Sequence, residues 1–295
     1  MILVVGASGK LGGQVAQKLL AQGTPVRALS RDPARLEQLQ AVGAEVVQGD
    51  LRDSDSLARA CRGVEKVMAA THAFTGAATN SMERIDGAGN RALIEAARAA
   101  GVTHFVFTSA CTGPDDPVDF FRVKYATEQY LRASGLPFTI LRPGAFMEDH
   151  AERVGRPVVE KGWTVVFGKG EGLANYVAAR DVAEVAVRVL GERPRGDIVW
   201  IGGPENLSAM DIVRTYERAS GRQARVYHVP EGALRVLARI AGPILPVVRR
   251  IVDAGLFMES GKQTIDPGET LARYPIRLTS LEEFVQQRYG AFGAR

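Results

Sequence analysis

The first half of the chain alternates short apolar runs with longer amphipathic segments. The apolar runs are nearly continuous stretches of Val, Ile, Leu and Phe, which is typical of parallel strands buried on both faces. The amphipathic segments repeat their apolar residues at helical spacing. The predicted strands are 2–6, 25–30, 44–50, 66–71, 104–110 and 138–144, and the predicted helices are 11–21, 33–41, 53–61, 82–100 and 118–134. This alternation predicts an α/β fold with a doubly wound parallel sheet.

The alternation becomes looser after residue 147. We therefore expect a first domain at 1–147 and a smaller C-terminal α/β lobe at 148–295. The two are expected to interleave, with the part at about 175–203 returning to the first sheet. The elements predicted in this half are a helix at 181–190, a strand at 197–203 and a helix at 209–219.

The late segment 233–261 is apolar and is interrupted at Gly242-Pro243 and Pro246, which predicts helices with apolar faces. These helices cover a pocket, form a seam between two copies of the chain, or do both; the pattern leaves the alternatives open, a homodimer included. The arginines and prolines of the segment exclude a membrane span, so no membrane partner is expected.

The formal net charge is +4, and the basic residues are scattered without a long run. A nucleic-acid partner is therefore not expected. The two cysteines, Cys61 and Cys111, are too few for a disulfide framework and form no C-x-x-C motif, so no metal site is expected. The first residues are too short an apolar run for a secretion signal. These features favour a cytoplasmic protein.

Three glycines follow the first predicted strand at regular spacing. Gly6, Gly9 and Gly12 form G-x-x-G-x-x-G at the start of the next helix. In a dinucleotide site such glycines permit the tight turn, the approach of backbone amides to a pyrophosphate, and close packing of helix on sheet. The alternative is a generic tight turn, but the strand rhythm favours dinucleotide binding.

The end of the second predicted strand indicates which dinucleotide is preferred. NAD sites place Asp or Glu there to bind the ribose 2′-hydroxyl, whereas this chain has Ser30 followed by Arg31. A hydroxyl and a guanidinium suit a 2′-phosphate, so NADP(H) is expected over NAD(H). Asp32 is expected to cap the next helix, and Arg27 either adds charge to the site or is a solvated strand residue.

Asp50 and Leu51 follow the third predicted strand. The carboxylate can accept a hydrogen bond from an adenine amino group while Leu51 packs on the ring. The alternative is that Asp50 caps local structure, and the sequence leaves both open.

Several segments resemble the atypical, NmrA-like branch of the short-chain dehydrogenase/reductase superfamily. They are VVGASGKLGGQV, VRALSRDP, VVQGDLRD, FVFTSA, KYATEQYLRASGLPFTILRPGAFMED, ARDVAEVAVRVL and GGPENLS, which together run from residue 4 to about 208. The resemblance implies a Rossmann domain whose small C-terminal lobe closes over the nicotinamide. It also implies relatives among quinone reductases, benzylic-ether reductases and NADP(H)-binding redox sensors.

Most catalytic members of that superfamily carry Tyr-x-x-x-Lys, but here Phe120 stands at the tyrosine position ahead of Lys124. Phenylalanine has no proton to give, and Tyr125 lies about 100° round the helix. Lys124 precedes Pro137 by thirteen residues, which is where ether-reductase relatives place an acid/base lysine. The resemblance therefore implies that Lys124 contacts the nicotinamide ribose, and proton transfer stays open. The alternative is a surface lysine paired with Glu128.

Further cofactor contacts are expected at the carboxyl ends of the strands, where open α/β sheets bind ligands. Thr108 and Ser109 end the fifth predicted strand, although such hydroxyls often cap local backbone. The full set of expected cofactor contacts is Gly6, Ser8, Gly9, Lys10, Leu11, Gly12, Ser30, Arg31, Asp50, Leu51, Ala70, Thr71, Thr108, Ser109, Lys124, Pro143, Gly144 and Phe146.

Two hypotheses about function follow. The first is an NADPH-dependent reductase that transfers hydride to a small quinone, enone or phenolic-type acceptor, with Lys124 as the expected catalytic residue. The second is a non-catalytic NADP(H)-sensing regulator that docks a partner protein, which Phe120 favours. A sugar-nucleotide epimerase or dehydratase is disfavoured because that chemistry depends on the Tyr-Lys pair.

Overall fold

The structure, a computed structural model, describes residues 1–76 and 80–290, and its centre is a seven-stranded parallel sheet. The strand order is β10-β6-β5-β4-β1-β2-β3, so the direction of succession reverses between β1 and β4. The strands are β1 (Ile2–Val5), β2 (Val26–Ser30), β3 (Glu45–Gln48), β4 (Lys66–Ala69), β5 (His104–Thr108), β6 (Phe138–Pro143) and β10 (Asp197–Ile201). The predicted doubly wound α/β fold is confirmed.

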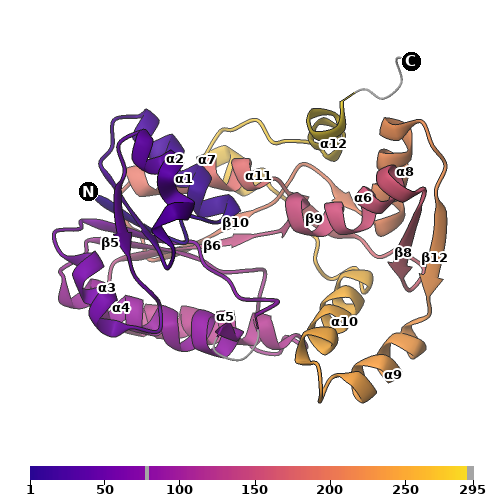
Figure 1. The fold of residues 1–295 in the computed structure, drawn as a ribbon, viewed down its shortest axis with the longest axis horizontal. Coiled ribbons are helices and arrows are strands. Elements are labelled where there is room, and N and C mark those ends of the chain that lie inside the picture. Colours follow the sequence, from indigo (N-terminus) through magenta and orange to yellow (C-terminus); the bar gives the residue numbers. More distant parts are fainter. Residues whose placement is uncertain (77–79, 291–295) are drawn as a thin grey trace. The chain divides into compact units, whose positions relative to one another are not determined.

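Helices cover both faces of this sheet. Helices α1, α2 and α7 lie on one face, and α3, α4 and α5 lie on the other (Figure 1). Their bounds are α1 (Lys10–Ala21), α2 (Glu37–Ala41), α3 (Ser54–Cys61), α4 (Asn90–Ala99), α5 (Asp119–Ala133) and α7 (Ala179–Gly191). The bounds of these helices agree with the predicted bounds to within one or two residues, except at the starts of α2 and α4.

The two exceptions are wound differently at their starts. The segment predicted at 33–41 opens with a 3-10 turn, η1 (Pro33–Leu36), and the segment predicted at 82–100 opens with a π-helical stretch, η3 (Glu83–Gly89). A π-helix takes more residues per turn and is frequent at functional sites. In η3 the wide turn carries the fully buried Asp86.

The inner strands of the sheet are buried on both faces, as their composition predicts, whereas the edge strands β3 and β10 are partly exposed. Every residue of β1 and β5 is buried, and both Phe105 and Phe107 are completely inaccessible. Burial of one such side chain contributes about 2–3 kcal/mol. This core makes the carboxyl ends of the strands a rigid platform.

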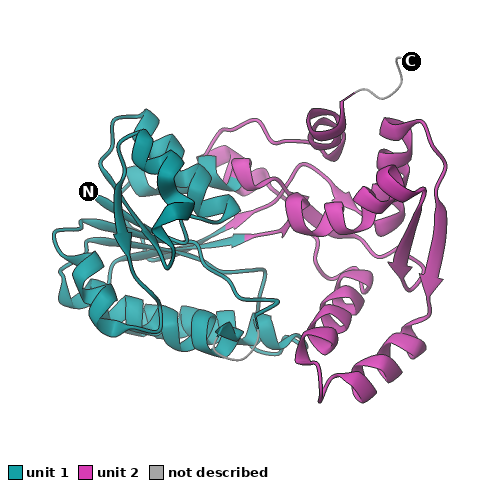
Figure 2. Ribbon diagram, in the orientation of Figure 1, with its two compact units in different colours: residues 1–142, 182–199 teal, residues 143–181, 200–295 magenta. Residues whose placement is uncertain are grey.

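The chain forms two compact units (Figure 2). The first comprises residues 1–142 and 182–199, and the second comprises 143–181 and 200–295. The second unit has a three-stranded sheet in the order β11-β9-β7 and a parallel pair, β12-β8. Its elements are β7 (Ala145–Phe146), η4 (Met147–Ala151), α6 (Glu152–Lys161), β8 (Trp163–Phe167), β9 (Ala174–Val177), β11 (Asn206–Leu207), α8 (Ala209–Ser220), β12 (Arg225–Val229), α9 (Glu231–Ala241), α10 (Pro246–Glu259), α11 (Gly268–Arg273) and α12 (Leu281–Tyr289).

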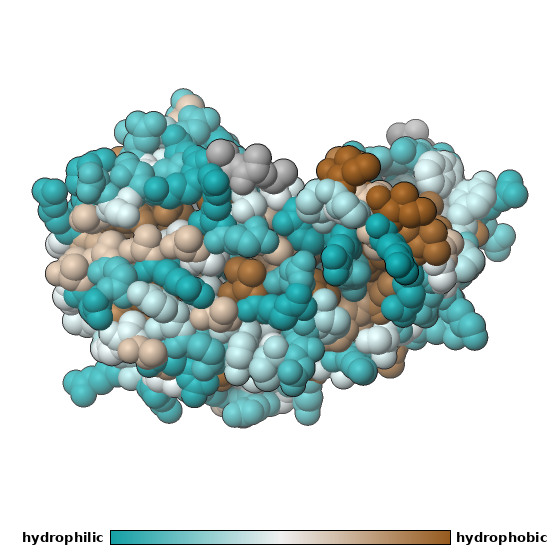
Figure 3. Space-filling model, turned by 90° about the horizontal axis from the view of Figure 1, so that it is seen from below, coloured by the Kyte–Doolittle hydropathy of each residue, from teal (hydrophilic) through white to brown (hydrophobic). Residues whose placement is uncertain are grey.

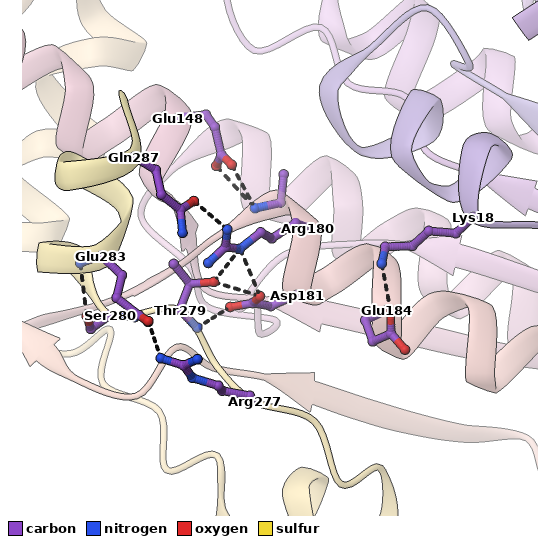
Figure 4. A network of polar contacts seen from close by, with 11 residues as sticks. Lys18, Glu148, Arg180, Asp181, Glu184, Arg277, Thr279, Ser280, Glu283 and Gln287 are labelled. Atoms are coloured by element: carbon purple, nitrogen blue, oxygen red, sulfur yellow. Dashed lines mark hydrogen bonds and ion pairs between the residues drawn. The ribbon is translucent and has the colours of Figure 1, made fainter. Parts of the chain in front are cut away.

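A network of hydrogen bonds within the second unit holds the segment that leads into α12 (Figure 4). Asp181 accepts hydrogen bonds from the backbone N–H and the hydroxyl of Thr279, at 2.7 and 2.9 Å. Arg180 donates to Thr279 and Gln287, while Glu148 accepts from the backbone N–H of Ala179. The bonds made by Asp181 and Arg180 connect segments about a hundred residues apart in the sequence.

The predicted helices of the segment 233–261 are present as α9 and α10, separated at Gly242 and Pro243. Exposed apolar side chains gather on α9 and the turn after it, where Ile240 is 70% and Ile244 is 80% exposed. In the space-filling view the larger hydrophobic patches, coloured brown, lie in the right-hand part of the picture (Figure 3). Among residues 1–76 and 80–290, none of the helices is both long enough and apolar enough to cross a bilayer.

Candidate functional site

A cavity of about 660 Å³ opens in the first unit, at the carboxyl ends of β1, β2 and β4. It lies where the strand order reverses between β1 and β4, which is the usual ligand position in an open α/β sheet. The expected cofactor residues that line it are Gly6, Ser8, Gly9, Ser30, Arg31, Asp50, Leu51, Ala70 and Thr71.

The glycine turn forms one wall of this cavity and admits no side chain at two positions. Gly6 has φ +87°, and a Cβ there would lie 2.6 Å from the carbonyl oxygen of Ala70. A Cβ on Gly12 would lie 2.3 Å from the carbonyl oxygen of Gly6. Both glycines are therefore required by close backbone packing.

The helix that follows the turn begins without a side-chain cap. Gly9 is the N-cap of α1, no side chain caps it, and the first turn carries no acidic residue. The first N–H groups of a helix lack partners within the helix, and its dipole favours an anion at that end. Lys10, Leu11 and Gly12 form this first turn and do not line the cavity themselves. The arrangement fits a phosphate group.

Two arginines border the cavity beyond β2. Arg31 donates from Nη1 to Oδ1 of Asn80 at 2.6 Å, and Arg35 donates from Nη2 to the carbonyl oxygen of Ser8 at 3.4 Å. Sequence reasoning missed Arg35, although its place one turn after Arg31, behind the helix-starting proline, was a usable signal. Asp32 caps η1 by accepting from the N–H of Ala34, as predicted.

The third candidate cation, Arg27, is not part of this cavity wall. It pairs with Glu45 and donates to the carbonyl oxygens of Ala60 and Arg62. Neither interpretation made from the sequence holds, because Arg27 is a structural link between β2, β3 and the end of α3.

Asp50 lines the cavity as a paired carboxylate. Arg52 donates to it from the backbone N–H and from Nε, both at 2.9 Å. The hydrogen bond from Arg52 is the main reason that the pKa of Asp50 lies below its usual value. The alternative that Asp50 caps local structure is confirmed, because it accepts from the backbone N–H of Arg52, whereas Asp53 is the cap of α3. Arg52 also lines the cavity and was missed.

Lys124 is buried, with 2% of its side chain exposed. Its Nζ lies 2.8 Å from Oδ1 of Asp86 and donates to the carbonyl oxygens of Thr71 and Thr108 at 3.0 and 3.1 Å. The alternative of a surface pair with Glu128 is wrong. That carboxylate pairs instead with Arg142, and Glu128 is itself fully buried.

Aromatic rings complete the surroundings of the Lys124 ammonium. Its Nζ lies 5.1 Å from the ring centroid of Phe107 and 5.6 Å from that of Phe120. The ring of Phe120 in turn meets Phe74 edge to face at 5.3 Å. The residue at the tyrosine position of the superfamily motif thus packs beside the ammonium and offers no proton.

Three hydroxyls near the ends of β4 and β5 are buried and lack a hydrogen-bond partner among residues 1–76 and 80–290. They are Thr71 Oγ1, Thr108 Oγ1 and Ser109 Oγ. Buried polar groups are nearly always paired, so three orphaned hydroxyls in one region indicate a polar ligand that the protein alone does not supply.

The remaining expected contacts belong to the second unit. Pro143, Gly144 and Phe146 lie there, and their contact with a cofactor stays a prediction. Gly144 has a structural reason to be glycine, because a Cβ would lie 2.8 Å from Oδ1 of Asn175. Burial raises the pKa of Cys111 to about 12, which leaves its thiol protonated. In the described parts of the chain no group of three His, Cys, Asp or Glu residues could hold a metal ion.

Comparisons with known proteins agree with this architecture. An NAD(P)H azoreductase from Xenophilus azovorans is 34% identical over 227 residues, which cover 76% of each chain. The photosystem II assembly factor Ycf39 of Synechocystis is 29% identical over 300 residues, covering 98% of this chain and 90% of that one. The Escherichia coli NADPH-dependent quinone oxidoreductase QOR2, crystallised with NADPH, superimposes with a TM-score of 0.82 at 27% identity, covering 98% and 100% of the two chains. A model of the NmrA-like family matches residues 1–285, so the chain belongs to the NmrA-like family.

Proposed function

We propose that this protein is an NADP(H)-dependent oxidoreductase that transfers hydride to a small quinone, enone or phenolic-type acceptor. The observation that carries the proposal is the cavity itself. It joins the uncapped start of α1 to two arginines beyond β2, Arg31 and Arg35. Of the two carboxylates in its wall, Asp50 pairs with Arg52 and Asp32 caps η1.

The residues present fit an NADP(H) molecule in the first unit. The backbone of Ser8, Gly9 and the first turn of α1 would hold the pyrophosphate. Arg31 and Arg35 would hold the 2′-phosphate, for which a forked guanidinium is well suited. The unpaired hydroxyls of Thr71 and Thr108 would bind polar atoms of the nicotinamide half.

The cofactor, when bound, supplies a hydride to the acceptor. For a quinone the balance is NADPH + H⁺ + quinone → NADP⁺ + hydroquinone, and water can provide the proton. The chain's own contribution is then to bind, orient and shield the two reactants. This requirement suits a site whose tyrosine position holds Phe120, because no side-chain acid is needed at that point.

The relatives support this chemical class. The azoreductase and the quinone oxidoreductase carry reductase names, and both names include a nicotinamide cofactor. The similarity covers 76% of this chain in the first comparison and 98% in the second.

A non-catalytic NADP(H)-binding regulator is the second candidate. It is favoured by the missing acid at Phe120, by the fully enclosed Lys124, and by the likeness to an assembly factor. The exposed apolar residues of α9 are suitable for contact with a partner protein.

The deciding experiment follows NADPH consumption by absorbance with a panel of quinones, conjugated enones and azo dyes. A reductase oxidises NADPH with at least one acceptor and prefers NADPH to NADH. Tight NADPH binding without turnover on the whole panel would overturn the enzyme in favour of the regulator. Absence of NADPH and NADP⁺ binding would overturn both candidates.

A further inference from the structure

Asp86 connects the wall of the cavity to helix α5. It is fully buried within η3, and its Oδ2 accepts a hydrogen bond from the backbone N–H of Ala73 at 2.8 Å. Its Oδ1 lies 2.8 Å from Nζ of Lys124. Ala73 lines the cavity directly after β4, so one carboxylate joins the cavity wall to the buried cation.

The ammonium of Lys124 is held by partners within the protein. Its Nζ donates hydrogen bonds to the carbonyl oxygens of Thr71 and Thr108 and forms an ion pair with Asp86. The rings of Phe107 and Phe120 lie 5.1 and 5.6 Å from it. A proton donor must direct an N–H toward the reacting atom, whereas these three polar partners of the ammonium all belong to the protein.

The same pair fixes the backbone that bears the unpaired hydroxyls. Lys124 binds the carbonyl oxygens of Thr71 and Thr108, the residues whose Oγ1 atoms lack partners. Asp86 holds Ala73, two residues after Thr71. The ammonium of Lys124 thus holds the ends of β4 and β5, and the carboxylate of Asp86 holds the segment that follows β4.

We infer that Asp86 and Lys124 are a positioning pair, which orients Thr71, Ala73 and Thr108 toward the nicotinamide half of the nucleotide and does not protonate the acceptor. Asp86 is thereby added to the residues that the sequence predicts to shape the nucleotide site. The inference rests on the proposed function, because it takes the cavity to be a nucleotide site.

A double-mutant cycle on NADPH binding tests the pair. The variants are Asp86→Asn, Lys124→Met and the two combined, which removes both buried charges together. Each single change is expected to raise the NADPH dissociation constant about tenfold, and the double variant is expected to match a single one, because both residues act through the same backbone. Additive losses, about a hundredfold in the double variant, would overturn the inference.

Amide hydrogen exchange without nucleotide provides a readout that does not depend on cofactor or activity. The N–H of Ala73 should exchange at least about tenfold faster in Asp86→Asn, because it loses its charged acceptor. Glu128→Gln is the matched control, since it removes another fully buried carboxylate that pairs with Arg142 and has no contact with Ala73. Equal protection of Ala73 in wild type and Asp86→Asn would overturn the inference.

Turnover at saturating NADPH separates positioning from proton donation. In the double variant the pH profile of kcat with a quinone should keep both limbs of the wild-type profile, because no titrating proton donor has been removed. Loss of one limb of that profile would make Lys124 the proton donor. If wild type binds NADPH yet reduces no acceptor, the enzyme proposal fails, while the binding cycle and the exchange experiment still decide the positioning role.

Discussion

Arg35 donates a hydrogen bond from Nη2 to the carbonyl oxygen of Ser8, 3.4 Å away, and so joins the turn after β2 to the glycine turn after β1. Arg31 meets the cavity from the same side and binds Asn80. Both guanidiniums are exposed, and the acceptors that hold them within residues 1–76 and 80–290 are neutral oxygens. They are therefore available to an anion without the loss of an ion pair.

The first prediction is that Arg31→Ala and Arg35→Ala weaken binding of NADPH much more than binding of NADH. A charge-assisted contact to the 2′-phosphate contributes about 1.5–3 kcal/mol, so each change should raise the NADPH dissociation constant at least about tenfold. Fluorescence titration with both nucleotides measures the ratio.

Arg59→Ala is the control for this pair, because Arg59 is an exposed arginine on α3 that does not line the cavity. It should leave both dissociation constants unchanged. Equal losses for NADPH and NADH in Arg31→Ala and Arg35→Ala would show that the two arginines do not read the 2′-phosphate.

The second prediction concerns Gly12. In Gly12→Ala the new Cβ would lie 2.3 Å from the carbonyl oxygen of Gly6, a backbone atom that cannot move without opening the turn. We expect a loss of about 1–3 kcal/mol in the free energy of unfolding and a marked loss of NADPH binding. Urea denaturation and nucleotide titration measure the two effects.

Gly191→Ala provides the same substitution without the clash. Gly191 ends α7, and a Cβ there meets nothing within 4 Å. Its stability should be unchanged or slightly higher, because alanine restricts the unfolded chain. If Gly12→Ala bound NADPH as wild type does, the glycine turn would not be the pyrophosphate site.

The third prediction is that neither cysteine behaves as a reactive thiol in the folded protein. Burial raises the pKa of Cys61 to about 11 and that of Cys111 to about 12. The thiolate is the reactive form, so alkylation by iodoacetamide at pH 7.5 should be slow until the protein is unfolded. Mass spectrometry before and after addition of denaturant measures it. Rapid labelling of Cys111 in the native protein would contradict the expectation.

The central sheet could be predicted because its inner strands are buried on both faces and leave a simple signature in the sequence. The glycine turn was equally visible, since its spacing reflects close backbone packing at Gly6 and Gly12. The two-residue strands β7 and β11 carry no such pattern. They exist because of pairing with β9, which is a tertiary effect.

The partners of charged residues were harder to predict. The local spacing on α5 favours a pair between Lys124 and Glu128, but both side chains are buried and have distant partners. Asp86 looked like one more polar residue of an amphipathic helix. Only the π-helical winding of η3 and the packing of that segment against α5 bring its carboxylate to Lys124.

The last prediction is a loss of stability in mild acid caused by His104. This side chain is 1% exposed, and its Nε2 lies 3.0 Å from Oγ1 of Thr139. Burial is the main cause that lowers its pKa from 6.5 to about 4, and the nearby charge of Lys66 acts in the same direction.

Between pH 6.5 and about 4 the unfolded chain therefore binds a proton at His104 that the native protein does not. Stability rises with pH wherever the unfolded state binds more protons, so the free energy of unfolding should fall as the pH drops through this range. The full contribution of this one group is about 3 kcal/mol. Urea denaturation of wild type and His104→Gln at several pH values isolates it, because all other titrating groups are common to both proteins. The difference between the two should shrink toward pH 4, and a difference that is independent of pH would show that the pKa of His104 is the same in the native and unfolded protein.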